Sequence, residues 1–217
     1  MRGLPFQSRT EAGRLLAEEL KHHKLPLNTV ILALPRGGVP VGFAIAQALH
    51  LSLDVVVARK LGVPWQPELA MGAIAGEALA LDQPLIRDLR IPRQDVDAVV
   101  ARESAELERR EKLYRGARRA PVVRGRTAVL VDDGLATGST MLAAARYVRS
   151  LLPVSLRIAV PVGSRQACQL VESEGDECIC LAKPLPFAAV GQWYEDFRQV
   201  SDAEVTNQLE LSHRQAV

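Results

Sequence analysis

Apolar residues gather along this chain in short runs, and each run is closed by a turn signal or followed by a helical pattern. The run over 29–34 ends at Pro35–Gly38, which predicts a buried strand leading into a tight loop. The first sixty residues predict a helix over 10–23 capped by Thr10, a strand over 29–34, an Ala-rich helix over 41–49 and a strand over 53–58. Strand, helix and strand in succession form the repeating unit of a parallel sheet.

The same alternation returns after Gly125. It predicts strands over 127–131, 155–160 and 177–181, with helices over 139–151 and 165–174 between them. The fold class is therefore α/β, an open parallel sheet of about five strands flanked by helices, with a small hood or lid.

Three stretches depart from this rhythm within what we expect to be a single domain over 1–217. Residues 59–92 are rich in Gly and Pro and predict a flexible loop followed by a hairpin insertion near 71–81. Residues 93–115 predict one long charged helix. The tail, 182–217, carries several aromatic residues and is expected to form the hood.

Bulk composition is that of an ordinary soluble protein, with 48% hydrophobic and 24% charged residues. The net charge of +2 does not call for a polyanionic partner. The first residues form no secretory signal and no apolar stretch reaches membrane-spanning length, so we expect a cytoplasmic protein without a membrane partner. Cys168, Cys178 and Cys180 form no CxxC pair, and we interpret them as reduced thiols.

The segment Val129 to Thr140 (VLVDDGLATGST) carries the chemistry. A buried strand delivers Asp132 and Asp133 at its carboxyl end, where open α/β sheets bind ligands. Small residues, hydroxyls and the start of a helix follow, which suits a monophosphate. The two carboxylates suit vicinal sugar hydroxyls, because an ionised carboxylate only accepts hydrogen bonds. The triphosphate motif GxxxxGK[ST] and the dinucleotide motif GxGxxG are both missing from the sequence.

This segment resembles the signature of the type I phosphoribosyltransferases. The stretches around Pro35–Gly38, 58–62 and 193–197 are similar to a poorly characterised branch of that family, and the resemblance covers about 1–205. It implies transfer of ribose 5-phosphate from 5-phosphoribosyl 1-diphosphate to a nitrogenous base or related small-molecule acceptor, with Mg²⁺ as cofactor. Dimers are common in the family, and the sequence leaves a homodimer open.

The resemblance also implies roles for individual residues. Asp132 and Asp133 would hold the ribose hydroxyls as catalytic residues, and with Asp196 they are candidates for holding the metal. The 5-phosphate would lie against Ala136, Thr137, Gly138, Ser139 and Thr140. The diphosphate would meet Arg36, Gly37 and Gly38, in a loop that in the family often carries a cis peptide bond, and also Arg59 and Lys60 at the end of the second strand and in the mobile loop. Phe187 and Trp193 are candidates to stack on the base.

One position departs from part of the family. In the 6-oxopurine enzymes an aspartate that acts as a base stands where this chain has Ala136. Alanine cannot accept a proton, so the acceptor stays open, and Glu68 and Glu195 are candidates for the base by position alone.

Two alternatives to transfer remain. A regulatory sensor would bind the diphosphate sugar or nucleotides without turnover and could bind RNA through the basic stretch Arg109–Arg126. That stretch contains a single aromatic residue, which is too few for base stacking along a single strand, and nucleic acid is not the favoured partner. A hydrolase on the same scaffold would release diphosphate without forming a nucleotide.

Overall fold

Five parallel strands form the main sheet in the order β2-β1-β6-β7-β8. The structure is a computed structural model that describes residues 4–116, 118 and 120–215. The strands are β1 (Val30–Ala33), β2 (Ser52–Val55), β6 (Thr127–Val131), β7 (Ser155–Val162) and β8 (Glu177–Ala182). The predicted five-stranded parallel α/β sheet is confirmed.

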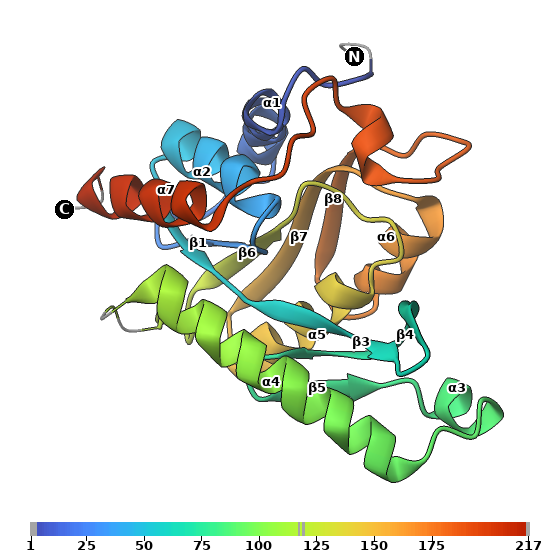
Figure 1. The fold of residues 1–217 in the computed structure, drawn as a ribbon. Coiled ribbons are helices and arrows are strands. Elements are labelled where there is room, and N and C mark those ends of the chain that lie inside the picture. The colour runs from blue at the N-terminus through green and yellow to red at the C-terminus, as the bar shows by residue number, and fades with distance from the viewer. Residues whose placement is uncertain (1–3, 117, 119, 216–217) are drawn as a thin grey trace.

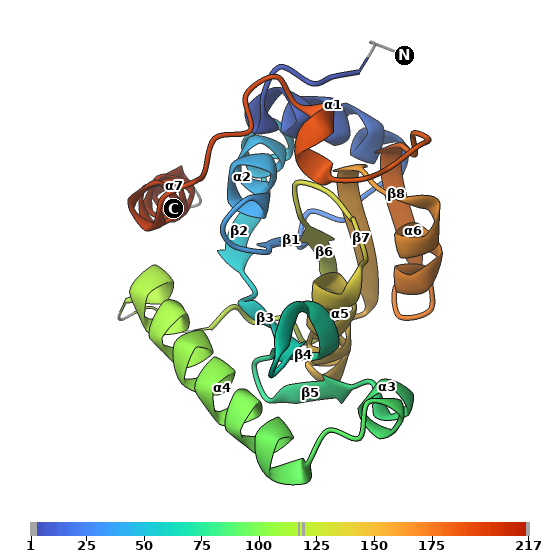
Figure 2. The ribbon, with the colours of Figure 1, turned by 45° about the vertical axis from the view of Figure 1, so that its right-hand side comes forward.

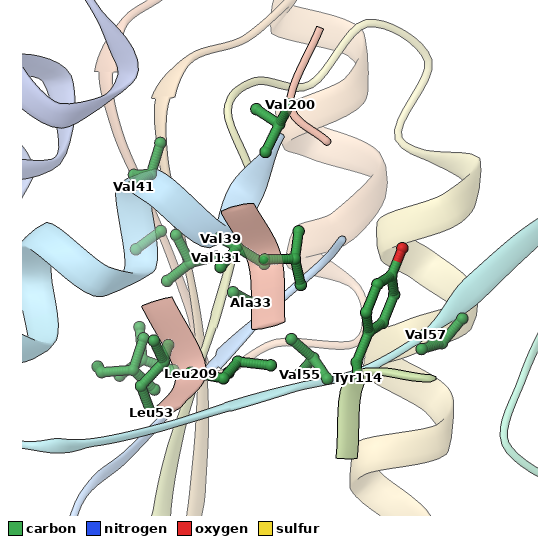
Figure 3. Packing of buried hydrophobic residues seen from close by; sticks show 14 of the residues in the cluster. Ala33, Val39, Val41, Leu53, Val55, Val57, Tyr114, Val131, Val200 and Leu209 are labelled. Atoms are coloured by element: carbon green, nitrogen blue, oxygen red, sulfur yellow. The ribbon is translucent and has the colours of Figure 1, made fainter. Parts of the chain in front are cut away.

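Helices cover both faces of this sheet (Figure 1). One layer contains α1 (Arg9–His22), α2 (Gly38–Leu49) and α7 (Asp202–Gln215), and the other contains α5 (Ser139–Ser150) and α6 (Arg165–Glu172). Successive side chains of a strand point to opposite faces. Ile31 and Ala33 therefore pack in the first layer, whereas Val30 and Leu32 pack in the second. In Figure 3, Ala33 and Val131 lie among the buried side chains of the first layer.

A second, antiparallel sheet lies beside the main one (Figure 2). It consists of β3 (Ala58–Val63), β4 (Gln66–Ala75) and β5 (Ala78–Leu81), followed by α3 (Gln83–Asp88) and α4 (Arg93–Arg115). The flexible loop predicted at the start of 59–92 is wrong, because β3 and β4 pair as a hairpin with a short turn at 64–65. The predicted hairpin near 71–81 is confirmed as β4 and β5.

Several predicted boundaries change. Ser8, not Thr10, caps α1, because its side chain accepts a hydrogen bond from the N–H of Glu11. The second strand ends at Val55 and not at residue 58. The tail contains two helices that were not predicted, the short 3₁₀ helix η1 (Val190–Trp193) and the helix α7. The long charged helix is confirmed with the predicted limits.

The three cysteines are free thiols in and around the second layer, and Cys168 of α6 is fully buried. Across the described ranges, no helix combines the length and the apolar character that crossing a membrane requires.

Candidate functional site

Two loops meet at the carboxyl ends of neighbouring strands. The loop Pro35–Gly38 follows β1 and the loop beginning at Asp132 follows β6, and these strands pair so that Ala33 lies opposite Val131. The N–H of Leu34 also donates to the carbonyl oxygen of Val131 at 2.8 Å. The main-chain ladder thus brings the predicted diphosphate loop beside the predicted ribose-binding acids.

Glycine is required where these two loops touch. A Cβ on Gly37 would lie 2.0 Å from Oδ2 of Asp133, and one on Gly38 would lie 2.7 Å from the carbonyl oxygen of Val131. Neither position has room for a side chain. The peptide bond between Pro35 and Arg36 is cis, as the resemblance implied.

The two adjacent acids have different surroundings. Arg9 donates from Nε to Oδ2 of Asp133 at 2.7 Å, and both side chains are largely buried. Asp132 is half-buried, and within the described part of the chain its Oδ1 accepts only the N–H of Asp133, at 2.8 Å. Burial and the neighbouring charge of Asp133 raise the pKa of Asp132 well above its usual range. Burial also raises the pKa of Asp133, but Arg9 opposes that shift.

The segment after the acids forms an open turn into α5. Leu135 is anchored to β7 and the following loop, because its N–H donates to Val162 and its carbonyl accepts from Ser164. Ala136 and Thr137 are exposed, and Gly138 takes a left-handed φ of 80° immediately before the helix. No side chain of the described residues caps this helix end, so its first N–H groups are available to an anion. Ser139 and Thr140 add hydroxyls, with Ser139 Oγ 3.4 Å from that of Thr137.

Arg36 reaches from the first loop toward the carboxyl-terminal helix. Its Nη1 lies 4.0 Å from Oδ1 of Asp202, the first residue of α7. That oxygen also accepts the hydroxyl of Tyr114 at 2.6 Å. Burial, followed by the Asp202 hydrogen bond, raises the pKa of Tyr114 to about 12, so the phenol remains a donor. The Tyr114 ring is drawn in Figure 3.

Arg59 and Lys60 do not lie at the end of the second strand, as the sequence predicted. Both belong to β3 of the antiparallel sheet. Arg59 forms an ion pair with Glu103 of α4, and Lys60 forms one with Glu68 at 3.2 Å. Arg59 and Lys60 are therefore paired with carboxylates of their own region, and the structure does not bring them to the acid pair as the sequence suggested.

The aromatic residues of the tail pack together in one cluster. The rings of Phe187 and Trp193 lie 6.1 Å apart, and Trp193 Nε1 is buried without a hydrogen-bond partner among the described residues. Asp196 is exposed, and its carboxylate accepts the N–H of Arg198 at 3.1 Å. The predicted metal ligand Asp196 therefore pairs locally and does not join the acid pair.

The two candidates for a base are both exposed. Glu195 faces solvent, and the side chain of Glu68 is 95% accessible and engaged with Lys60. The structure therefore adds nothing to the positional argument for either residue.

Sequence reasoning missed two residues of the site, Arg9 and Tyr194. The buried Tyr194 donates its hydroxyl to the carbonyl oxygen of Asp133 at 2.6 Å. Arg9 and Asp133 are 124 positions apart, so no motif spacing could have linked them. The only signal in the sequence is the aromatic stretch over 193–197, through its resemblance to the family branch.

The basic stretch Arg109–Arg126 is largely engaged within the chain. Arg109 and Arg110 pair with Glu106, and Arg115 pairs with Asp54 and Glu111. Arg118 and Arg126 donate to main-chain carbonyls, whereas Arg119 lies outside the described residues. Guanidinium groups bound in this way are poor phosphate contacts, which weakens the RNA-binding alternative.

Comparison with known proteins gives a consistent picture. A family model described as "Phosphoribosyl transferase domain" matches residues 65–191. Over 211 residues, or 96% of this chain, the sequence is 44% identical to a Mycobacterium tuberculosis protein provisionally named phosphoribosyl transferase. That stretch is 47% of the relative, so the chain spans about half the length of the curated relatives it matches.

Solved structures show the same fold. The crystal structure of a Thermus thermophilus protein is 40% identical, with a TM-score of 0.81, and the match covers 95% of this chain and 98% of that one. A hypothetical protein of Neisseria gonorrhoeae, solved with bound ppGpp, is 12% identical with a TM-score of 0.53 over 97% and 99% of the two chains. The second likeness supports the shared fold alone.

Proposed function

Because this chain belongs to the phosphoribosyl transferase domain family, we propose that it transfers ribose 5-phosphate from 5-phosphoribosyl 1-diphosphate to a nitrogenous base. The observation that carries the proposal is the contact between the Pro35–Gly38 loop and the acids of the 132–140 segment. One donor molecule carries an anion at each end of its sugar. Two anion-binding loops that flank a pair of sugar-binding acids match that arrangement.

In this proposal each part of the donor has its own place. The 5-phosphate accepts hydrogen bonds from main-chain N–H groups and hydroxyls at the start of α5. The ribose hydroxyls donate to Asp132 and Asp133. The diphosphate meets the backbone of Gly37 and Gly38, together with Arg36, whose 4.0 Å separation from Asp202 is long enough to leave its guanidinium available.

Magnesium fits the donor set of this site. Mg²⁺ prefers oxygen ligands and is usually held by one or two carboxylates together with water and substrate phosphates. Asp132 offers a carboxylate that no cation of the described residues neutralises, whereas Asp133 is paired with Arg9. Asp132 would therefore hold the ion with the donor, and when bound the ion would neutralise diphosphate charge.

The reaction breaks the bond between C1 of ribose and the diphosphate oxygen, and the leaving diphosphate takes the electron pair. A nitrogen of the acceptor forms the new bond to C1 from the opposite face, so the configuration inverts, and the acceptor loses a proton. The chain contributes by holding the two substrates in line and excluding water. Ala136 cannot take this proton, and the panel of bases in the test below identifies the acceptor.

The test measures turnover. Protein, Mg²⁺ and the diphosphate sugar are incubated with a panel of purine and pyrimidine bases, and both diphosphate and nucleoside monophosphate are quantified. Transfer is expected for at least one base, and it should fall sharply in Asp132→Asn. Asp88→Asn, which changes an exposed carboxylate on α3, is the matched control and should leave the rate unchanged.

Two results would contradict the proposal. Donor binding without diphosphate release for any base would instead favour the regulatory sensor. Diphosphate release without nucleotide formation would favour a hydrolase on the same scaffold.

A further inference from the structure

Arg9 is an arginine at the start of a helix whose guanidinium is almost entirely enclosed. It is the first residue of α1, and its side chain is 10% exposed. Besides the 2.7 Å bond to Asp133, it donates from Nη1 to the carbonyl oxygen of Arg198 at 2.8 Å. Its guanidinium also lies 3.9 Å from the centroid of the Phe197 ring. Three different partners therefore fix its orientation.

The same region joins the N-terminal segment to the 193–198 segment. Main-chain hydrogen bonds link Phe6 to Trp193 and to Glu195 at 2.8 Å each, and a further bond runs from Asp196 to Gln7 at 3.0 Å. Through its hydrogen bond to Asp133, Arg9 connects this junction to the donor site. The position of Asp133 consequently depends on segments that are remote from it in sequence.

Oxygen Oδ2 of Asp133 is confined from two sides. Arg9 holds it on one side, and the backbone of Gly37 approaches it so closely on the other that no Cβ would fit. Oδ1 lies farther from that point, 3.2 Å from the place of the absent Cβ against 2.0 Å for Oδ2. The carboxylate is thus oriented with Oδ2 bound to Arg9 and with Oδ1 able to accept a hydrogen bond from a ligand.

We propose that Arg9 is a positioning residue of the donor site, which orients Asp133 so that Oδ1 accepts a ribose hydroxyl. This inference rests on the proposed function and adds to it a residue outside the motif. Because Arg9 also contacts the Phe197 ring and the carbonyl oxygen of Arg198, the position of Asp133 depends on where the 193–198 segment lies.

The experiment is a double-mutant cycle on donor affinity. Calorimetry measures the Kd of the Mg²⁺ complex of 5-phosphoribosyl 1-diphosphate for the wild type, Arg9→Gln, Asp133→Asn and the double variant. Arg9→Gln is expected to raise the Kd about 10- to 100-fold, which is the range for losing a hydrogen bond to a charged group. In the Asp133→Asn background the same change is expected to have little further effect, because its target is already altered.

Two further variants separate positioning from stability. Arg9→Lys keeps the charge but loses the planar fork and the ring contact, so its Kd should lie between those of the wild type and Arg9→Gln. Arg14→Gln, an exposed position on the same helix, is the matched control and should leave the Kd unchanged. If Arg9→Gln fails to fold, the cycle is run with Arg9→Lys.

The outcomes are distinct. Equal losses in both Asp133 backgrounds, or no loss on changing Arg9, would overturn the positioning role while leaving the transferase proposal intact. Failure of the wild type to bind the donor at all would overturn the proposed function itself.

Discussion

The substitution Gly37→Ala tests the contact between the two loops. Gly37 has φ −61° and ψ −36°, a helical conformation that alanine adopts without strain. At such a position glycine to alanine is usually stabilising by about 0.4–1 kcal/mol, because the unfolded chain loses freedom. Backbone considerations alone therefore predict a more stable protein.

The packing predicts the opposite sign. The new methyl group would lie 2.0 Å from Oδ2 and 2.6 Å from Cγ of Asp133, so the carboxylate would have to retreat. Retreat is resisted because Arg9 holds Oδ2 at 2.7 Å and is itself held by Phe197 and Arg198. Forcing an extra methyl group into a packed region costs about 1–3 kcal/mol. We expect a net loss of about 1–2 kcal/mol, or about 2–8 °C in melting temperature for a chain of this size.

Thermal and urea unfolding, followed by circular dichroism, measure this change. The control is the same substitution in an Asp133→Ala background, where the oxygen and Cγ are missing. There Gly37→Ala should no longer destabilise and should show the ordinary gain of about 0.4–1 kcal/mol. A higher melting temperature for Gly37→Ala with Asp133 present, or equal losses in both backgrounds, would refute the reasoning.

Four further predictions concern charge, burial and the metal. Burial raises the pKa of Asp132 in the folded state. The ionised carboxylate therefore lowers the free energy of unfolding at pH values above the folded-state pKa, and this cost is absent below the pKa of the unfolded chain. Asp132→Asn should raise the melting temperature at pH 7, and the gain should vanish in acid. Tyr194→Phe leaves the Asp133 carbonyl without its 2.6 Å donor and should cost about 1–3 kcal/mol in urea unfolding. The Arg149 hydrogen bond lowers the pKa of Asp176, so Asp176→Asn should destabilise at neutral pH, with the difference disappearing as the pH falls through the folded-state pKa. Chelating Mg²⁺ with EDTA should abolish donor binding in calorimetry, and unchanged binding would contradict the assigned cofactor.

The main sheet was predictable because its strands are continuous apolar runs closed by clear signals. The strand Thr127–Val131 was predicted with its observed limits, since all five of its residues are buried and acids follow it directly. The helix α4 was likewise predicted with its observed limits. In each case local sequence and tertiary packing favour the same structure.

The first hairpin of the second sheet was not predictable, because glycine and proline are also loop signals. In the fold, a Cβ on Gly62 would lie 2.4 Å from the carbonyl oxygen of Pro67. This glycine therefore marks a close approach between β3 and β4, which depends on a partner strand that the sequence does not identify. Helix α7 did carry a signal, because Val205 and Leu209 are buried one helical turn apart.

The residues of the candidate site likewise fall into those that a local motif indicates and those that depend on long-range contacts. The acids, the 136–140 turn and the Pro35–Gly38 loop each follow a strand directly, so a single local motif could indicate them. Arg9 could not be found in this way, because it reaches Asp133 only once the N-terminal segment has folded against the 193–196 segment.

That long-range contact changes how the motif itself is understood. Asp132 and Asp133 stand side by side in sequence and look interchangeable there. In the fold, Oδ2 of Asp133 is bound by Arg9 and lies against Gly37, whereas Asp132 has no cation within ion-pair distance among the described residues. A carboxylate whose charge is uncompensated gains most from a bound cation, and one already paired gains least. We therefore expect Asp132→Asn to weaken the Mg²⁺ dependence of donor binding more than Asp133→Asn does, a difference that a magnesium titration of the two variants measures directly.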